Sequence, residues 1–125
     1  NTAARIVTCS RKYDHITPIL KTLHWLPVDL RIDFKILLLT YKAMNGLSPV
    51  YLRDLLIKHE PTRELRSSTK NLLAIPSRKT KATYGDKAFS MTAPRLWNSL
   101  PIEIRCAKTT ESFKRLLKTF LFDKF

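Results

Sequence analysis

Side chains suited to acid–base or metal chemistry are sparse in this sequence, and Asp29 and Asp33 come nearest to a paired site. They are one helical turn apart in a segment of helical periodicity, and paired carboxylates can hold a metal ion or share a proton. Arg31 and Lys35 are interleaved with them. Charges placed in this way are typical of the wet strip of an amphipathic helix. We therefore interpret both carboxylates as solvated and expect no metal site.

The histidines and cysteines also lack functional spacing. His15, His24 and His59 make no His-x3-His pair, and Cys9 and Cys106 make no Cys-x2-Cys pair. Neither cysteine lies in a recognisable nucleophile motif, and no glycine-rich phosphate-binding loop occurs. The sequence alone gives no case for an enzyme, and we expect no cofactor and no small-molecule substrate. Ordinary thiols indicate a reducing compartment, the nucleus or the cytoplasm.

Basic side chains are the more informative group. They crowd residues 60–86, where Ser67, Ser68 and Thr69 add further hydrogen-bond donors and Tyr84 adds a ring for stacking. Such a surface is suited to following the phosphates of a nucleic acid. The candidate nucleic-acid-binding residues are Arg11, Lys12, Arg63, Arg66, Lys70, Arg78, Lys79 and Lys81. The alternative interpretation is a solvated basic loop without a ligand.

The overall charge supports the same class of partner. The chain of 125 residues has 23 Lys plus Arg against 10 Asp plus Glu, a net charge of +13. This balance favours RNA, DNA or an anionic membrane surface. No apolar run approaches the roughly 18 residues that span a bilayer. We interpret the amphipathic C-terminal segment as a helix packed on its own core, and expect no membrane partner.

Helices are the elements expected to position these residues. Pro18 in the first turn predicts a short helix over residues 17–23. The longest helix is expected from Pro27 to about residue 45, with Gly46 as its left-handed cap. Its apolar residues cover most of its circumference, which is typical of a central helix. A further helix is expected over residues 48–58.

The second half of the chain is less regular. We expect a weak two-stranded hairpin near residues 72–84, turning around Ser77-Arg78. Pro94 argues against one helix over 86–100, so we expect a short helix that begins at Pro94 and ends before Pro101. The final helix has Thr109 or Thr110 as its cap. Its apolar stripe consists of Phe113, Leu116, Leu117, Phe120 and Leu121.

Together these patterns predict a mainly α protein, a small helical domain of about five helices with that short hairpin. The length allows one domain, residues 1–125. Trp25 and Trp97 have apolar neighbours, and we expect both to be core anchors. The first residues have a small apolar face without a helix start signal, and the chain begins at Asn1 rather than Met. We therefore expect a fragment of a longer protein.

The order of several segments resembles the C-terminal region of the reverse-transcriptase polyprotein of jockey-like LINE (non-LTR) retrotransposons. The resemblance covers essentially the whole chain, and its most specific piece is Ala93–Pro101. The other matching segments are residues 11–20, 23–28, 34–43, 48–52, 66–68, 84–90 and 113–122.

The resemblance implies a non-catalytic tail. In such elements an apurinic-type endonuclease and a polymerase precede this region, and residues 1–10 resemble the end of the last thumb-like helix. The paired aspartates of the polymerase motif are absent from this sequence, as is the Cys/His zinc knuckle of some related elements. The implied partners are the polymerase portion of the same polyprotein and the backbone of RNA or DNA.

The function expected from charge and resemblance together is binding of template RNA or target DNA during target-primed reverse transcription. Two alternatives remain open. One is a structural module that packs on the polymerase thumb without contacting nucleic acid. The other is an independent small RNA- or chromatin-binding protein derived from an element remnant.

Overall fold

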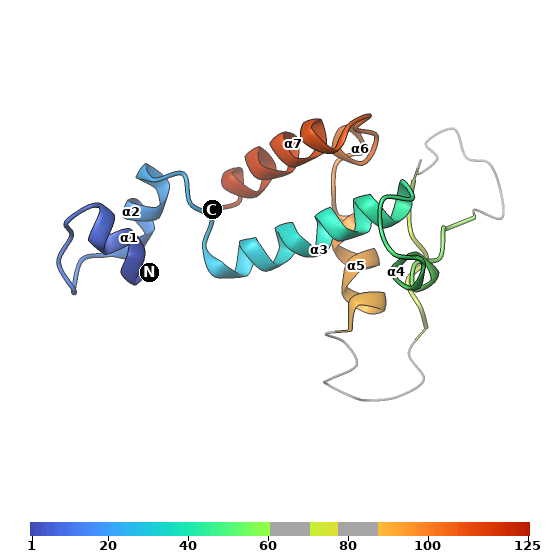
Figure 1. Cartoon of the computed structure of the whole chain (residues 1–125), viewed down its shortest axis with the longest axis horizontal. Coiled ribbons are helices and arrows are strands. Elements are labelled where there is room, and N and C mark those ends of the chain that lie inside the picture. Colours follow the sequence, from blue (N-terminus) through green and yellow to red (C-terminus); the bar gives the residue numbers. More distant parts are fainter. Residues whose placement is uncertain (61–70, 78–87) are drawn as a thin grey trace.

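The computed structural model describes residues 1–60, 71–77 and 88–125, and these form helices joined by short connections (Figure 1). They contain no strand, and one isolated antiparallel bridge joins Lys58 to Leu73. The helices are α1 (Thr2–Val7), α2 (Ile16–Thr22), α3 (Val28–Met44), α4 (Val50–Asp54), α5 (Phe89–Asn98), α6 (Ile102–Arg105) and α7 (Thr110–Asp123). The prediction of a mainly helical small domain is confirmed, with more and shorter helices than expected.

The long helix α3 is central, as its sequence predicted. It packs against α4, α5 and α7, and α7 lies alongside it in Figure 1. The core forms where α3, α5 and α7 meet. There the Phe113 ring stacks on Tyr41 at 4.2 Å and on Trp97 at 5.9 Å between centroids. The Tyr41 hydroxyl also donates a hydrogen bond to the Ala107 carbonyl at 2.9 Å, which ties the connection between α6 and α7 to α3.

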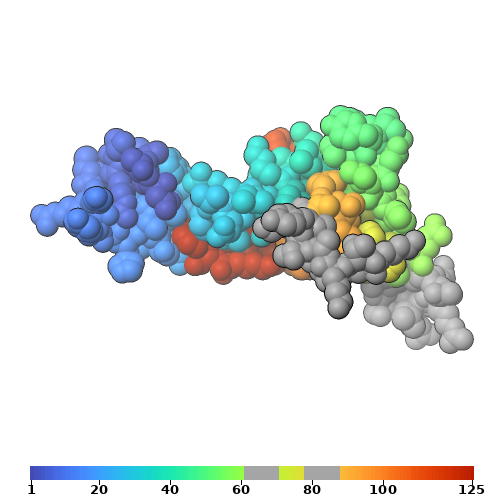
Figure 2. All heavy atoms as spheres, turned by 90° about the horizontal axis from the view of Figure 1, so that it is seen from below, coloured from blue at the N-terminus to red at the C-terminus, as the bar shows by residue number. Residues whose placement is uncertain are grey.

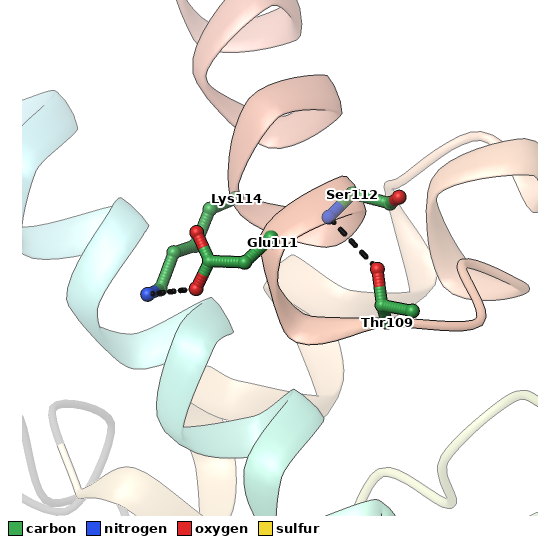
Figure 3. Close-up of polar contacts among 4 residues, drawn as sticks. All are labelled: Thr109, Glu111, Ser112 and Lys114. Atoms are coloured by element: carbon green, nitrogen blue, oxygen red, sulfur yellow. Dashed lines mark hydrogen bonds and ion pairs between the residues drawn. The ribbon is translucent and has the colours of Figure 1, made fainter.

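The helix α7 follows its sequence signals closely. Thr109 is the N-cap, and its side-chain oxygen accepts a hydrogen bond of 3.2 Å from the Ser112 N–H (Figure 3). Glu111 lies in the first turn and pairs with Lys114 at 2.8 Å. Phe113, Leu117 and Leu121 of the expected stripe are buried. Thr109, rather than Thr110, is therefore the cap.

The helix α5 differs from its prediction, because it runs through Pro94 rather than beginning there. Proline lacks the N–H that would bond to the Ser90 carbonyl, and this loss normally disfavours a helix interior. Here Pro94 is fully buried together with Ala93 and Trp97. Packing in the core outweighs the local preference. Pro101 differs as well, because it is also the N-cap of α6, which the sequence did not suggest.

The expected hairpin over residues 72–84 is not seen in its described part. Residues 71–77 contain no strand, and the bridge from Leu73 goes back to Lys58. The His59 N–H donates to the Leu72 carbonyl at 3.0 Å, and the Ala74 N–H to the Ile57 carbonyl at 2.8 Å. The helix expected to reach residue 58 accordingly ends earlier, at Asp54. Residues 78–84 lie outside the described part of the chain.

The Leu73 segment is held by a side chain of α5 as well. The Asn98 amide accepts a hydrogen bond from the Leu73 N–H at 3.0 Å and donates one to the Leu73 carbonyl at 2.8 Å. The Leu73 side chain is buried in the core. An amide of one helix thus satisfies both backbone groups of an extended residue, as a neighbouring strand would.

Helices α1 and α2 pack on each other and project from one end of the body made by α3 and α7 (Figure 2). The C-terminus lies near the connection between α2 and α3 (Figure 1). No described helix has both the length and the apolar character needed to cross a bilayer.

Candidate nucleic-acid interface

Two of the predicted contact residues, Arg11 and Lys12, lie exposed in the turn between α1 and α2. The Arg11 N–H donates to the Asp14 carboxylate at 2.7 Å, and the Lys12 ammonium is 5.8 Å from the centroid of the Tyr13 ring. The other candidates lie outside the described residues: Arg63, Arg66, Lys70, Arg78, Lys79 and Lys81. Tyr84 lies outside them too. Most of the predicted basic segment, residues 60–86, therefore lies outside the part of the chain that the structure describes.

The described part of the chain has a different basic site, which we call the Trp25 cavity. It is a hollow of about 500 Å³ between the α2–α3 connection, the first half of α3 and α7. It is lined by His24, Trp25, Leu26, Arg31, Phe34, Lys35 and Lys118. Apolar and aromatic atoms form most of its wall, and the charged side chains that line it are all basic.

A left-handed residue at the end of α2 places Trp25 in this cavity. His24 has φ +53°, and its N–H donates to the Lys21 carbonyl at 3.0 Å. The Trp25 N–H then reaches back to the Leu20 carbonyl at 2.9 Å. These two bonds form a Schellman motif, in which glycine is the usual left-handed residue. The chain reverses sharply here, and Trp25 follows the reversal directly.

The start of α3 fixes the opposite side of the Trp25 cavity. Leu26 is buried, and the Arg31 Nε donates to the Leu26 carbonyl at 2.6 Å. The His24 ring lies 6.0 Å from the Phe122 ring near the end of α7. The α2–α3 connection is thus held to both helices that line the cavity.

Trp25 is not the core anchor that its apolar neighbours predicted. Its side chain is 37% exposed, whereas Trp97 is 1% exposed. The sequence signal that points to this outcome is position: Trp25 lies between a helix end and Pro27, outside any helix. Arg31 and Lys35, one turn apart on α3, give a second signal. These two signals are weaker than the charge excess of residues 60–86, which the sequence favoured as the binding surface.

Among the described residues, no Asp or Glu lines the Trp25 cavity. Asp33 of α3 is near Asp29 and Lys124 instead, and burial is the main cause that raises the pKa of its carboxyl group. The Asp29 charge adds to this increase, and the Lys124 ammonium opposes it. The two aspartates are near enough to interact, yet the described residues contain no cluster of three His, Cys, Asp or Glu side chains able to hold a metal.

The arrangement of charged and aromatic side chains in the Trp25 cavity is suited to binding an anion. Exposed cations beside an exposed aromatic ring can hold phosphates and stack a base. Cys9 and Cys106 are free and exposed and do not belong to the lining of the Trp25 cavity. No protein-family model, curated protein or solved structure matches this chain. The functional assignment therefore depends on its own residues.

Proposed function

We propose that this chain is a non-catalytic nucleic-acid-binding module, the tail of a LINE-type reverse transcriptase that holds template RNA or target DNA. The observation that carries the proposal is the net charge of +13, with basic side chains such as Arg11, Lys12, Lys35 and Lys118 on exposed positions. Exposed cations that outnumber acids in this way attract a polyanion. The resemblance supplies the parent protein and its role in target-primed reverse transcription.

Salt dependence of binding tests this function. About five phosphate contacts give a slope of log K against log salt near −4.5 on duplex DNA and near −3.5 on a single strand. We expect a labelled oligonucleotide to show such a slope in fluorescence anisotropy. A slope near zero, or no binding at low salt, contradicts the proposal.

The contribution of the basic segment is tested by the triple substitution Arg66→Ala, Arg78→Ala and Lys79→Ala. Because phosphate contacts carry no sequence information, we expect weaker binding of all sequences alike and a shallower salt slope. Unchanged affinity would show that the binding surface is elsewhere on the chain. The parent polyprotein is tested separately by the reading frame upstream of Asn1, which should continue into a polymerase with paired aspartates.

A structural module that packs on the polymerase portion is the second candidate. It is favoured by apolar side chains that the fold leaves in water, among them Ile32 at 53%, Val50 at 60% and Tyr51 at 67% exposure. Large exposed apolar residues are typical of surfaces that meet another protein. In this case the isolated chain should aggregate and bind no RNA, whereas the nucleic-acid-binding module remains dispersed and binds.

A further inference from the structure

We propose that the Trp25 cavity receives an unpaired base of a single-stranded nucleic acid, with Trp25 as the stacking ring and Lys35 and Lys118 as contacts for the neighbouring phosphates. This inference rests on the proposed nucleic-acid binding and names the site and the form of the ligand. Neither Trp25 nor these lysines were among the residues that the sequence suggested.

The position of the Trp25 ring favours stacking on a ligand. Trp25 is more than a third exposed, although a tryptophan is large enough to stabilise a core if it is buried. Its backbone is held by the hydrogen bond to Leu20, and the next residue, Leu26, is buried. A ring presented to solvent from a fixed backbone loses little freedom when a ligand stacks on it.

The charge around the Trp25 cavity favours an anionic ligand. Lys35 comes from α3 and Lys118 from α7, so cations approach the cavity from both helices. Within the described part of the chain, neither lysine has an ion-pair partner. Arg31 uses its Nε for the Leu26 carbonyl, and its Nη groups have no acceptor among the described residues. Basic groups without carboxylates fit an anion on the rim.

The shape of the Trp25 cavity favours an unpaired base. The hollow is open to solvent, and its volume of about 500 Å³ is within the range of small-molecule pockets. A base inside a duplex is stacked on both faces and cannot enter such a hollow, whereas an unpaired base presents its face to an aromatic side chain. Phosphates alone would need the cations but not the apolar wall. The combination therefore favours a single strand over a duplex.

The experiment compares a labelled single-stranded oligonucleotide with a duplex of equal length, using the full chain. Tryptophan emission is recorded together with anisotropy, because Trp25 is exposed and Trp97 is 1% exposed. The variants are Trp25→Ala, Trp25→Phe, and the pair Lys35→Ala with Lys118→Ala. The matched control, Arg53→Ala with Lys108→Ala, removes the same charge from exposed positions outside the Trp25 cavity. Circular dichroism checks that each variant is folded.

We expect the single strand to quench tryptophan emission, and Trp25→Ala to weaken its binding about 5- to 150-fold, the range of one base–aromatic stack. Trp25→Phe should recover most of this loss, and duplex affinity should not change. The lysine pair should lower the single-strand salt slope by about 1.4, because each phosphate contact contributes about 0.7. The control pair should lower it less.

Different results overturn different parts of the account. Equal binding of single strand and duplex, without quenching and without an effect of Trp25→Ala, overturns the assignment of the Trp25 cavity and leaves the proposed function standing. Absence of binding to either oligonucleotide overturns both. Quenching by vesicles of anionic lipid, without quenching by the single strand, identifies the cavity as a membrane contact and overturns the base site.

Discussion

Trp97 and Trp25 lie in two regions of the molecule that differ in how far they bury a tryptophan ring. Trp97 lies where α3, α5 and α7 meet, stacks on Phe113, and donates its indole N–H to the Asn71 carbonyl at 2.6 Å. Trp25 lies on the α2–α3 connection with more than a third of its surface in water. The fold supplies packing and a hydrogen bond for the Trp97 ring, whereas the Trp25 ring lines a cavity that Arg31, Lys35 and Lys118 also line.

The two tryptophans differ in what holds them in place. Aromatic residues at the α3–α5–α7 junction are closed off by neighbours on several helices. The ring at the α2–α3 connection is held through its backbone, by a turn with His24 in the left-handed region that few side chains adopt. We therefore expect substitutions at Trp97 to unfold the protein and substitutions at Trp25 to change binding.

Truncation of the two rings gives the largest contrast. Trp97→Ala removes a fully buried ring and leaves a cavity, which costs about 3–5 kcal/mol of unfolding free energy. Trp25→Ala should cost about 1 kcal/mol or less, since much of this ring is already in water. Urea denaturation followed by circular dichroism measures both. Equal destabilisation would show that Trp25 is a core residue after all.

Removal of the Asn98 amide is expected to have the next largest effect. Asn98→Ala leaves the N–H and the carbonyl of buried Leu73 without their partner, which costs about 2–3 kcal/mol. Ser99→Ala is the matched control, because its exposed hydroxyl donates only to the Leu96 carbonyl of the same helix. Thermal unfolding of both variants decides. If the two are equally stable, the bonds to Leu73 do not hold the Trp97 region together.

Tyr41→Phe separates polar from apolar contributions in the same region. It removes the hydroxyl that bonds to Ala107 and keeps the ring that stacks on Phe113. We expect a loss of about 1 kcal/mol, the usual net value of one hydrogen bond. Chemical denaturation gives the value, and Tyr51→Phe, at an exposed position, is the control. A loss as large as that of Trp97→Ala would contradict the view that ring packing dominates.

The smallest expected effect lies at Asp33, beside the Trp25 region. Burial raises the pKa of Asp33 in the folded protein, so its contribution to stability is present in acid and lost as the pH rises through that pKa. Asp33→Asn should therefore be slightly more stable than the parent at pH 7, by about 0.5 kcal/mol or less, because the carboxyl group is only partly buried and water screens its charge.

This gain should disappear near pH 3, where Asp33 is protonated in the parent protein. Thermal unfolding of the parent and of Asp33→Asn at both pH values measures it. A parent that is more stable than the variant at pH 7 would mean that Lys124 outweighs burial at this carboxyl group.

Local sequence signals predicted those helices for which the end signals and the apolar periodicity indicate the same residue range. Thr109 and the stripe from Phe113 to Leu121 describe α7, and Pro27 with Gly46 brackets α3. These elements have one periodicity and one clear cap, so their local preference and their packing coincide. The mainly helical class follows from them.

The other elements depend on contacts between distant residues, which local signals do not contain. Pro94 continues a helix because the core buries it, and Leu73 pairs with Lys58, which the sequence did not suggest. The Trp25 cavity brings Lys118 to Arg31 and Lys35, which are more than 80 residues away in the sequence. The apolar sequence neighbours of Trp25 predicted a buried ring, and this prediction was wrong. Sequence neighbours show the local composition, but they do not show which side of a segment the rest of the fold covers.

Photo-cross-linking can show whether a single-stranded nucleic acid contacts Trp25. A single-stranded oligonucleotide with a photoreactive uracil is irradiated with the full chain, and the attached peptide is identified after trypsin digestion. Residues 22–31 form one tryptic peptide, with Trp25, and residues 96–105 form another, with Trp97. We expect attachment to the peptide that contains Trp25, and less attachment in Trp25→Ala. Attachment to the peptide of Trp97, or none to the peptide of Trp25, would contradict this expectation.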